Sequence, residues 1–298
     1  MSAQPPHSPT RIAVGVDTHL DCHVAVALDH LGRRLGELAI TTDVAGYERL
    51  LRWVSSLGHD AVFGVEGTAS FGAGLCRFLQ QHGQRVLEVS RPNRQRRRMH
   101  GKSDPVDAEN AARAVLANDT TGQPKGSDGT VEMIRTLRLD RRSANQQRTS
   151  AINQLRAVVV TAPDELRQQL RTLTTRRLIY AAARLRPGAL TDPASAAKAA
   201  LRSLARRIRH LDAEIAELDA HIEPLVRDAA PGLLGVRGVG VQTAATLLIA
   251  AGDNRTRLHH ERAFARLCGV APIDASSGRQ QRHRLSRAGN RDANSACT

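Results

Sequence analysis

The pattern of hydrophobic and polar positions divides the first part of the chain into short segments. Runs at 11–19, 22–29 and 34–42 are apolar or alternate between apolar and polar residues, and turn residues separate them. Each run has the length and periodicity of a strand, so three consecutive strands joined as hairpins are predicted. Apolar residues at helical spacing then predict a helix over 44–57, with Asp43 as its N-cap.

The segments that follow alternate between strand and helix patterns. Strands are predicted at 61–67 and 85–90, and helices at 72–82 and 104–118. The resulting order, β-β-β-α-β-α-β-α, is that of a ribonuclease-H-like fold. This assignment rests on the order of the elements alone. We therefore predict an α/β domain of this class over 11–118.

Beyond a turn-rich linker at 119–130, the chain has a helical pattern as far as residue 230. Apolar residues in 201–225 alternate spacings of three and four without a break. This stripe is typical of a coiled coil, which would form a dimer or an intrachain hairpin with 131–160; an amphipathic helix packed on its own domain is the alternative. The stripe consists of Leu201, Leu204, Ile208, Leu211, Ile215, Leu218, Ile222 and Leu225. We treat 131–230 as a long helical coiled-coil region.

The last part of the chain, 231–298, begins at a proline that ends the long helical pattern. Within 233–253, Gly238 and Gly240 lie between two apolar helical stretches. This is the helix-hairpin-helix pattern, in which glycines permit a tight turn whose backbone N–H groups contact a DNA phosphate. We predict a small, helical C-terminal domain that includes this DNA-binding turn.

Composition adds a charge asymmetry to this picture. The 298 residues carry a net charge of +14, and 2% of them are aromatic. Residues 1–130 contain 15 Lys and Arg against 14 Asp and Glu, whereas 131–298 contain 28 against 15. Because arginine binds phosphate oxygens in a bidentate way, the basic half predicts a nucleic-acid partner contacted through its backbone. The arginine-rich composition of a GC-rich genome is the alternative.

The sequence shows no targeting pattern. No run approaches the roughly 20 apolar residues of a membrane span, and the N-terminal residues lack the basic and apolar regions of a signal peptide. The four cysteines form no CxxC pair, so neither a zinc site nor a disulfide framework is indicated. We expect a cytoplasmic protein with no membrane partner.

Four acidic residues stand where the predicted fold would bring them together. Asp17 and Glu66 follow apolar strands, and Asp104 and Asp107 lie on one face at the start of the helix over 104–118, with Asp104 as its expected cap. Strands one and four are neighbours in a ribonuclease-H-like sheet. Four adjacent carboxylates repel each other unless cations neutralise them, so we predict a site for Mg²⁺, with Mn²⁺ as the alternative, that could clamp a phosphoryl transfer.

A basic run at 91–102 precedes the acidic helix. Such a run is too polar for a core element. We expect it to grip the phosphates that flank the carboxylates; an exposed, solvated loop is the alternative. The residues concerned are Arg94, Arg96, Arg97, Arg98 and Lys102.

A second candidate for chemistry lies in 268–291. Ser276 and Ser277 precede Gly278, and basic residues that we expect to bind DNA crowd in after them: Arg279, Arg282, Arg284 and Arg287. Guanidinium groups could hold a scissile phosphate in line with a serine nucleophile, with His283 as the local base. An ordinary Ser-Gly turn in a basic loop is the alternative.

The chain resembles a known family through several motifs taken in order: VGVDTHLDCHVAVAL, GVEGTASFG, KSDPVDAENAARA, GVRGVGVQTAATLLIAAGD, FARLCGVAPIDASSG and HRLSRAGNR. Over roughly 11–291 it is similar to the transposases of insertion sequence family 110, the bridge-RNA-guided recombinases. The resemblance implies a catalytic DEDD tetrad of Asp17, Glu66, Asp104 and Asp107. It also implies a serine that attacks DNA covalently, which is Ser277 by position, with Ser276 left open.

The resemblance further implies a dimer or tetramer held partly by the coiled coil, and a structured guide RNA that pairs with DNA. The family's C-terminal domain normally continues with another helical segment, so the end at Thr298 predicts a truncated copy. We therefore expect a DNA recombinase with a composite active site. The alternatives are a Holliday-junction-type nuclease that uses the tetrad and water, and a non-catalytic nucleic-acid-binding protein.

Overall fold

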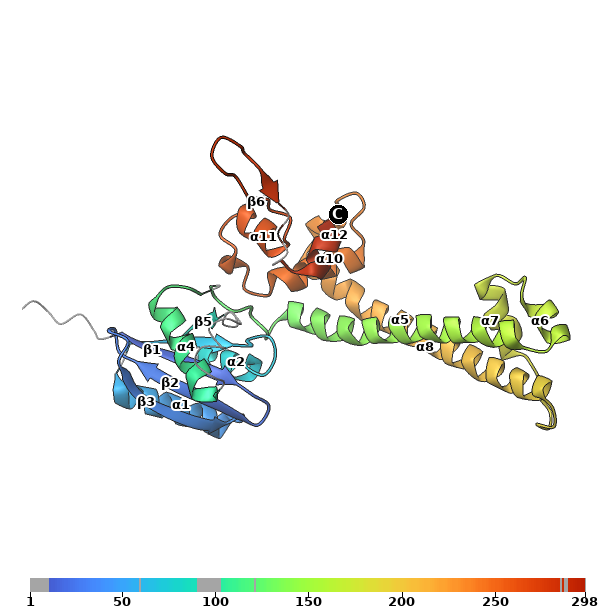
Figure 1. Cartoon of the computed structure of the whole chain (residues 1–298), viewed down its shortest axis with the longest axis horizontal. Helices are drawn as coiled ribbons and strands as arrows, with labels where there is room; N and C mark the ends of the chain where they lie inside the picture. Colours follow the sequence, from blue (N-terminus) through green and yellow to red (C-terminus); the bar gives the residue numbers. More distant parts are fainter. Residues whose placement is uncertain are drawn as a thin grey trace, which may run out of the picture. The chain divides into compact units, whose positions relative to one another are not determined.

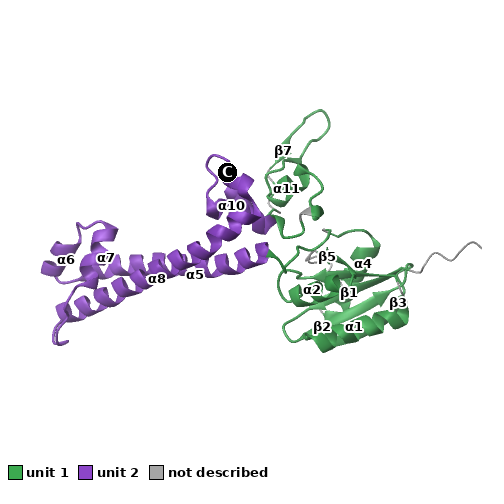
Figure 2. Ribbon diagram, turned by 180° about the vertical axis from the view of Figure 1, so that it is seen from behind, with its two compact units in different colours: residues 1–129, 251–290 green, residues 130–250, 291–298 purple. Residues whose placement is uncertain are grey.

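The computed structural model describes residues 11–58, 60–89, 103–120, 122–284, 286 and 289–297. The chain divides into two compact units (Figure 2). The first consists of the described residues of 1–129 together with 251–290, and the second of 130–250 together with 291–297.

A five-stranded sheet forms the centre of the first unit (Figure 1). Its strands lie in the order β3-β2-β1-β4-β5, where β2 is antiparallel to β1 and β3, and β4 is parallel to β1 and β5. This mixed sheet is compatible with a ribonuclease-H-like fold. The strands are β1 (Ile12–Thr18), β2 (Cys22–Leu28), β3 (Arg34–Thr41), β4 (Ala61–Glu66) and β5 (Arg85–Val89).

Helices cover both faces of the sheet. On one face, α1 (Val44–Leu57) and α2 (Ala73–Gln81) enclose the larger apolar core. Asp43 caps α1, as predicted, because its carboxylate accepts a hydrogen bond of 2.8 Å from the Gly46 N–H. On the other face lies α4 (Asp104–Leu116), which packs against β1 and β2.

Two long helices, α5 (Thr130–Thr161) and α8 (Pro193–Ala229), pack along each other in the second unit. The short helices α6 (Asp164–Leu170) and α7 (Thr175–Ala183) connect them. The apolar stripe of α8 is buried within the chain: Leu201, Ile208 and Ile222 are fully enclosed in cores that also contain residues of α5. The arrangement is the intrachain hairpin, one of the two packings that the stripe predicts.

The remaining helices and strands are short. They are α9 (Pro231–Leu234), α10 (Val241–Ala251), the 3₁₀ turn η1 (Arg255–Arg257), α11 (Glu261–Leu267), β6 (Ile273–Asp274), β7 (His283–Arg284) and α12 (Arg291–Cys297). In the second unit α10 packs on the core of α5 and α8, and α12 is joined to α5 by an ion pair of 2.9 Å between Arg142 and Asp292. None of the described helices has both the length and the hydrophobicity that crossing a membrane requires.

Hydrogen bonds join the segments 122–129 and 251–257 within the first unit. The Asn254 side chain accepts the Gly126 N–H and donates to the Pro124 carbonyl, both at 2.8 Å. The Arg257 guanidinium donates to the Gln123 carbonyl at 3.2 Å. The Asn254 clasp, as we name these contacts, holds the residues after α10 against the residues that follow the sheet domain.

Candidate active site

Asp17 and Glu66 lie side by side at the carboxyl ends of two parallel strands. The register of β1 and β4 pairs Val16 with Val65, so each acidic residue follows a paired position. The Thr18 hydroxyl donates a hydrogen bond of 2.8 Å to the Glu66 carbonyl and ties the two strand ends together. Asp17 and Glu66 are each only 8% exposed. The sheet therefore buries two carboxylates at one edge.

Helix α4 reaches this edge because the sheet beneath it lacks side chains at two positions. Gly15 and Gly64 are paired across β1 and β4, and the backbone of α4 lies directly against both. A Cβ atom at Gly15 would overlap backbone atoms of Ala108 and Ala112. The close approach carries the first turn of α4 to the ends of the two strands.

Asp104 and Asp107 occupy that first turn. Asp107 is 5% exposed, whereas the Asp104 side chain is half exposed. The prediction that Asp104 caps the helix is wrong: the extended Ser103 holds the N-cap position, and its carbonyl accepts the first helical hydrogen bond, from the Asp107 N–H at 3.1 Å. Asp104 is instead the first helical residue, just before Pro105.

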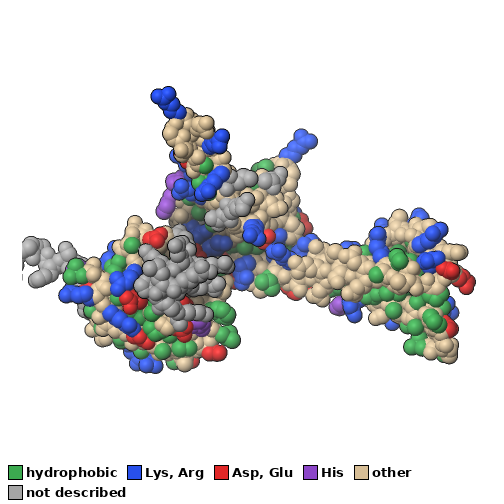
Figure 3. Space-filling model, in the orientation of Figure 1, with side chains coloured by type: hydrophobic (Ala, Val, Ile, Leu, Met, Phe, Trp, Pro, Cys, Tyr) green, Lys and Arg blue, Asp and Glu red, His purple; other side chains and the backbone are tan. Residues whose placement is uncertain are grey.

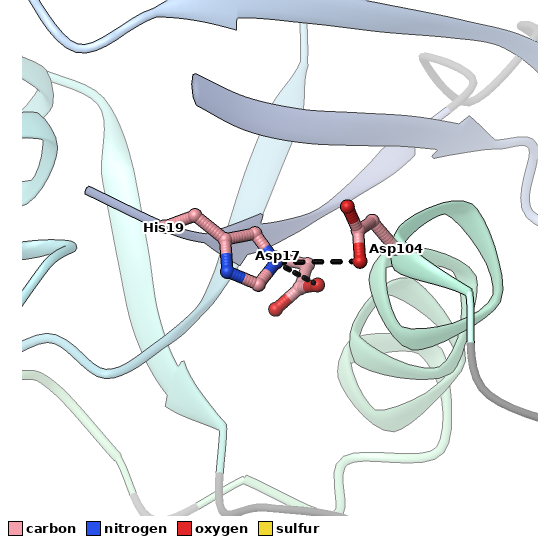
Figure 4. Close-up of side chains that lie close together, drawn as sticks. All are labelled: Asp17, His19 and Asp104. Carbon is pink, nitrogen blue, oxygen red and sulfur yellow. Dashed lines mark hydrogen bonds and ion pairs between the residues drawn. The ribbon is translucent and has the colours of Figure 1, made fainter. Parts of the chain in front are cut away.

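His19 completes the group, and sequence reasoning did not select it. Its Nε2 atom lies 3.1 Å from Asp17 Oδ2 and 3.4 Å from Asp104 Oδ1 (Figure 4). Among the described residues, these three side chains are the group whose metal-ligating atoms all lie within 4.8 Å of one another; Glu66 and Asp107 lie outside this tighter group. The spacing Asp-x-His at a strand end was the available signal.

Burial raises the pKa of the Asp17 carboxyl above its usual value, and the charges of Asp107 and Asp104 raise it further, while His19 opposes the rise. The cause is that a desolvated carboxylate surrounded by like charges is destabilised. A divalent cation would relieve this repulsion. Carboxylate oxygens at the ends of two strands and one helix are donors that suit Mg²⁺ or Mn²⁺, so the donor set fits the predicted metal.

A buried histidine supports the loop that carries His19. The His19 N–H donates to Nδ1 of His23 at 3.3 Å. The His23 ring is completely buried and stacks on the Tyr47 ring, with centroids 6.1 Å apart. Burial lowers the pKa of His23, which keeps the ring neutral and able to accept that hydrogen bond.

The candidate serines lie on an exposed hairpin formed by β6 and β7. The backbones of Ser277 and Gln280 exchange two hydrogen bonds of 3.1 Å, and Gly278 takes a positive φ of 57° in the turn between them. The Ser276 hydroxyl accepts the Arg282 N–H at 3.2 Å, and the Ser276 N–H donates to Asp274 at 2.8 Å. Ser276 therefore contributes both its backbone N–H and its hydroxyl to hydrogen bonds within the hairpin.

The candidate DNA-binding residues differ in how much the structure says of them. Arg279, Arg282 and Arg284 are exposed on the hairpin, where Figure 3 shows basic side chains. Gly238 and Gly240 are exposed in the turn between α9 and α10, and Gly238 has a φ of 88° that favours glycine. The other candidates lie outside the described residues: Arg94, Arg96, Arg97, Arg98, Lys102 and Arg287.

Comparison with known families gives two matches. A model of the DEDD domain of IS110 transposases, described as a transposase, matches residues 14–163, and a model of the IS116/IS110/IS902 transposase family matches residues 231–298. Comparison with curated proteins gives no match. The first match alone covers half of the chain and contains the carboxylates at the sheet edge, and the second contains the serine hairpin. The chain belongs to the IS110 family of transposases, enzymes that rearrange DNA.

Proposed function

We propose that this transposase cuts and rejoins DNA with two kinds of catalytic group, a metal-binding tetrad of Asp17, Glu66, Asp104 and Asp107 and a nucleophilic serine, Ser277. The observation that carries the proposal is the meeting of Asp17 with the first turn of α4 at the ends of β1 and β4. Burial and the charges of Asp107 and Asp104 raise the pKa of the Asp17 carboxyl, which is an unfavourable arrangement without a cation.

The tetrad would bind Mg²⁺, with Mn²⁺ as the alternative. A bound divalent ion would stabilise the charge that develops on the phosphate oxygens during phosphoryl transfer. Asp17 would be the central ligand, because it borders both Glu66 on the next strand and the helix residues Asp104 and Asp107. The helix supplies its two carboxylates from one face, three residues apart.

Ser277 is a better nucleophile candidate than Ser276. The Ser276 hydroxyl accepts a hydrogen bond from the Arg282 N–H, so this oxygen is already part of the hairpin. Ser277 lies exposed at the turn, next to Gly278 and Arg279. In the proposed step, Ser277 Oγ bonds to phosphorus, its proton passes to a base, and the phosphorus–oxygen bond to the leaving deoxyribose breaks while that oxygen takes a proton.

The remaining features of the proposal concern partners. The exposed arginines of the hairpin and the glycine turn before α10, as a helix-hairpin-helix, would bind DNA phosphates, and a structured guide RNA would select the DNA sites. We propose that the enzyme acts in the cytoplasm as a dimer or tetramer. The α5–α8 pair would form its coiled-coil part.

The test is a trap for covalent protein–DNA adducts. The full chain is expressed with its flanking DNA and RNA, lysed without crosslinker and run on denaturing gels as wild type, Ser277→Ala, Ser276→Ala and Asp17→Asn. We expect a metal-dependent adduct in wild type and Ser276→Ala that is lost in the other two variants. Cleavage without an adduct that survives Ser277→Ala would establish a nuclease that uses water. DNA binding with neither product would leave a non-catalytic binding protein.

A further inference from the structure

His19 has the position of a metal ligand but is not part of the proposed tetrad. Its Nε2 faces one carboxylate oxygen from β1 and one from α4, at 3.1 Å and 3.4 Å (Figure 4). The two carboxylates come from elements far apart in the sequence, so the imidazole lies where the strand end meets the helix. A nitrogen atom in this place is directed at the position that a cation bound by both carboxylates would occupy.

The support beneath His19 gives this placement a structural basis. Its backbone N–H is held by the ring of His23, which is fully buried and stacked on Tyr47. A buried polar side chain that anchors a loop fixes the path of that loop, since breaking the bond would leave a polar group unsatisfied in the core. The His23 ring therefore anchors the backbone of the loop at the point where His19 meets the carboxylates.

The exposure of His19 also suits a ligand. Its side chain is 48% exposed, while Asp17 is almost completely buried. A half-exposed ring can exchange its contact with Asp17 for a contact with a cation and carry its proton on Nδ1.

We propose that His19 is a metal-binding residue of this site, with Nε2 joining Asp17 and Asp104 around one divalent cation. The proposal rests on the proposed function, because it assumes that the carboxylates bind metal. Magnesium takes oxygen ligands almost without exception, whereas first-row transition metals accept imidazole readily. A nitrogen donor therefore shifts the preference of this site from Mg²⁺ toward Mn²⁺.

The test measures Mn²⁺ binding to the full chain by electron paramagnetic resonance, with electron spin echo modulation to detect nitrogen bound directly to the ion. The variants are His19→Asn and, as the matched control, His30→Asn. His30 is exposed and follows the end of β2 that pairs with the start of β1, far along the sheet from Asp17. Wild-type protein labelled with ¹⁵N-histidine provides a measurement that needs no substitution.

We expect an imidazole nitrogen signal in wild type and His30→Asn, a changed frequency in the labelled protein, and no signal in His19→Asn. Loss of a directly bound ligand should weaken Mn²⁺ binding by at least the roughly 10- to 100-fold that loss of an outer-shell partner costs, with a smaller effect on Mg²⁺. Mn²⁺ bound to wild type without a nitrogen signal would overturn the role of His19 and leave the carboxylate site intact. Asp17→Asn tests the metal site itself: if wild type did not bind Mn²⁺, or if Asp17→Asn bound it as tightly as wild type, the proposed metal site would fall, and the role of His19 with it.

Discussion

Replacing Gly15 with alanine should damage the candidate site without touching any of its polar groups. The added Cβ would lie more than about 1 Å inside ordinary van der Waals separation from the backbone of Ala108 and Ala112. Backbone atoms of a helix cannot rotate away as the end of a flexible side chain can. Helix α4 must therefore move off the sheet as a body.

The loss in free energy of unfolding that Gly15→Ala causes can be bounded from the packing. Overfilling a packed core typically costs about 1–3 kcal/mol, and we expect about 3 kcal/mol here because the new Cβ clashes with main-chain atoms of α4. A shift of the helix by about 1 Å would also move Asp104 and Asp107 away from Asp17. Misplacement of catalytic groups by this distance can reduce activity by roughly 100-fold.

The assay uses the only tryptophan of the chain. Trp53 lies in α1 and packs against the core of the sheet, so its fluorescence in urea reports unfolding of the first unit. Gly64→Ala should destabilise the first unit less than Gly15→Ala. The atom nearest to a Cβ added at Gly64, at 2.5 Å, is a side-chain methyl group of Val115. Gly232→Ala is the control, because a Cβ there meets nothing within 4 Å.

The order of stability should be Gly232→Ala, then Gly64→Ala, then Gly15→Ala. Equal urea midpoints for Gly15→Ala and Gly232→Ala would show that α4 does not rest on β1 as described. A destabilised Gly15→Ala protein that kept full activity at low temperature would refute the link between this packing and the position of the carboxylates.

Two further predictions follow from single side chains. Because the pKa of Asp17 is raised in the folded protein, ionisation of this carboxyl destabilises the metal-free fold as the pH rises through that pKa. With a chelator present to remove metal, Asp17→Asn should therefore increase the urea midpoint at about pH 7 but not at about pH 3. With Mg²⁺ at about 100 times its Kd, wild type should gain about 2.7 kcal/mol that this variant lacks; equal stabilisation of both would contradict a metal site at Asp17. Asn254→Ala removes the side-chain contacts of the Asn254 clasp and should speed hydrogen exchange of the Gly126 amide about fivefold, because one lost hydrogen bond costs about 1 kcal/mol. Asn254→Asp should have a smaller effect, since it keeps the oxygen that accepts the Gly126 N–H. Unchanged exchange in Asn254→Ala, measured by mass spectrometry, would show that the clasp does not form in solution.

The sheet domain was predictable because its elements are short and their periodicities are distinct. Each strand between Ile12 and Val89 matches an apolar or alternating run, and fold order then indicated that Asp17 and Glu66 would be neighbours. His19 was not predictable in the same way. A polar residue in a turn has the same pattern whether it faces solvent or a carboxylate, and only the path of the loop over His23 distinguishes the two.

The helical region shows a second limit of sequence reasoning. A stripe from Leu201 to Leu225 is equally suited to a helix of a second chain and to a helix of its own chain. In the structure α6 and α7 return the chain, and α8 packs on α5. Similarly, adjacent serines are equivalent in a sequence pattern, whereas in the structure only the Ser276 hydroxyl is seen to accept a hydrogen bond from the Arg282 N–H among the described contacts of the two serines.

The two strands that carry the buried carboxylates share one short motif. Residues 15–17 read Gly-Val-Asp and residues 64–66 read Gly-Val-Glu, and the strands pair these motifs in register. Side chains alternate between faces, so each valine enters the core under α1 and α2, while each glycine and each acidic residue faces α4. The glycines let the helix come close, and Asp17 then lies close enough to the first turn for the charges of Asp104 and Asp107 to raise its pKa. The repeated motif thus specifies both the packing of α4 and the position of the carboxylates, which is why a substitution as small as Gly15→Ala is expected to affect both.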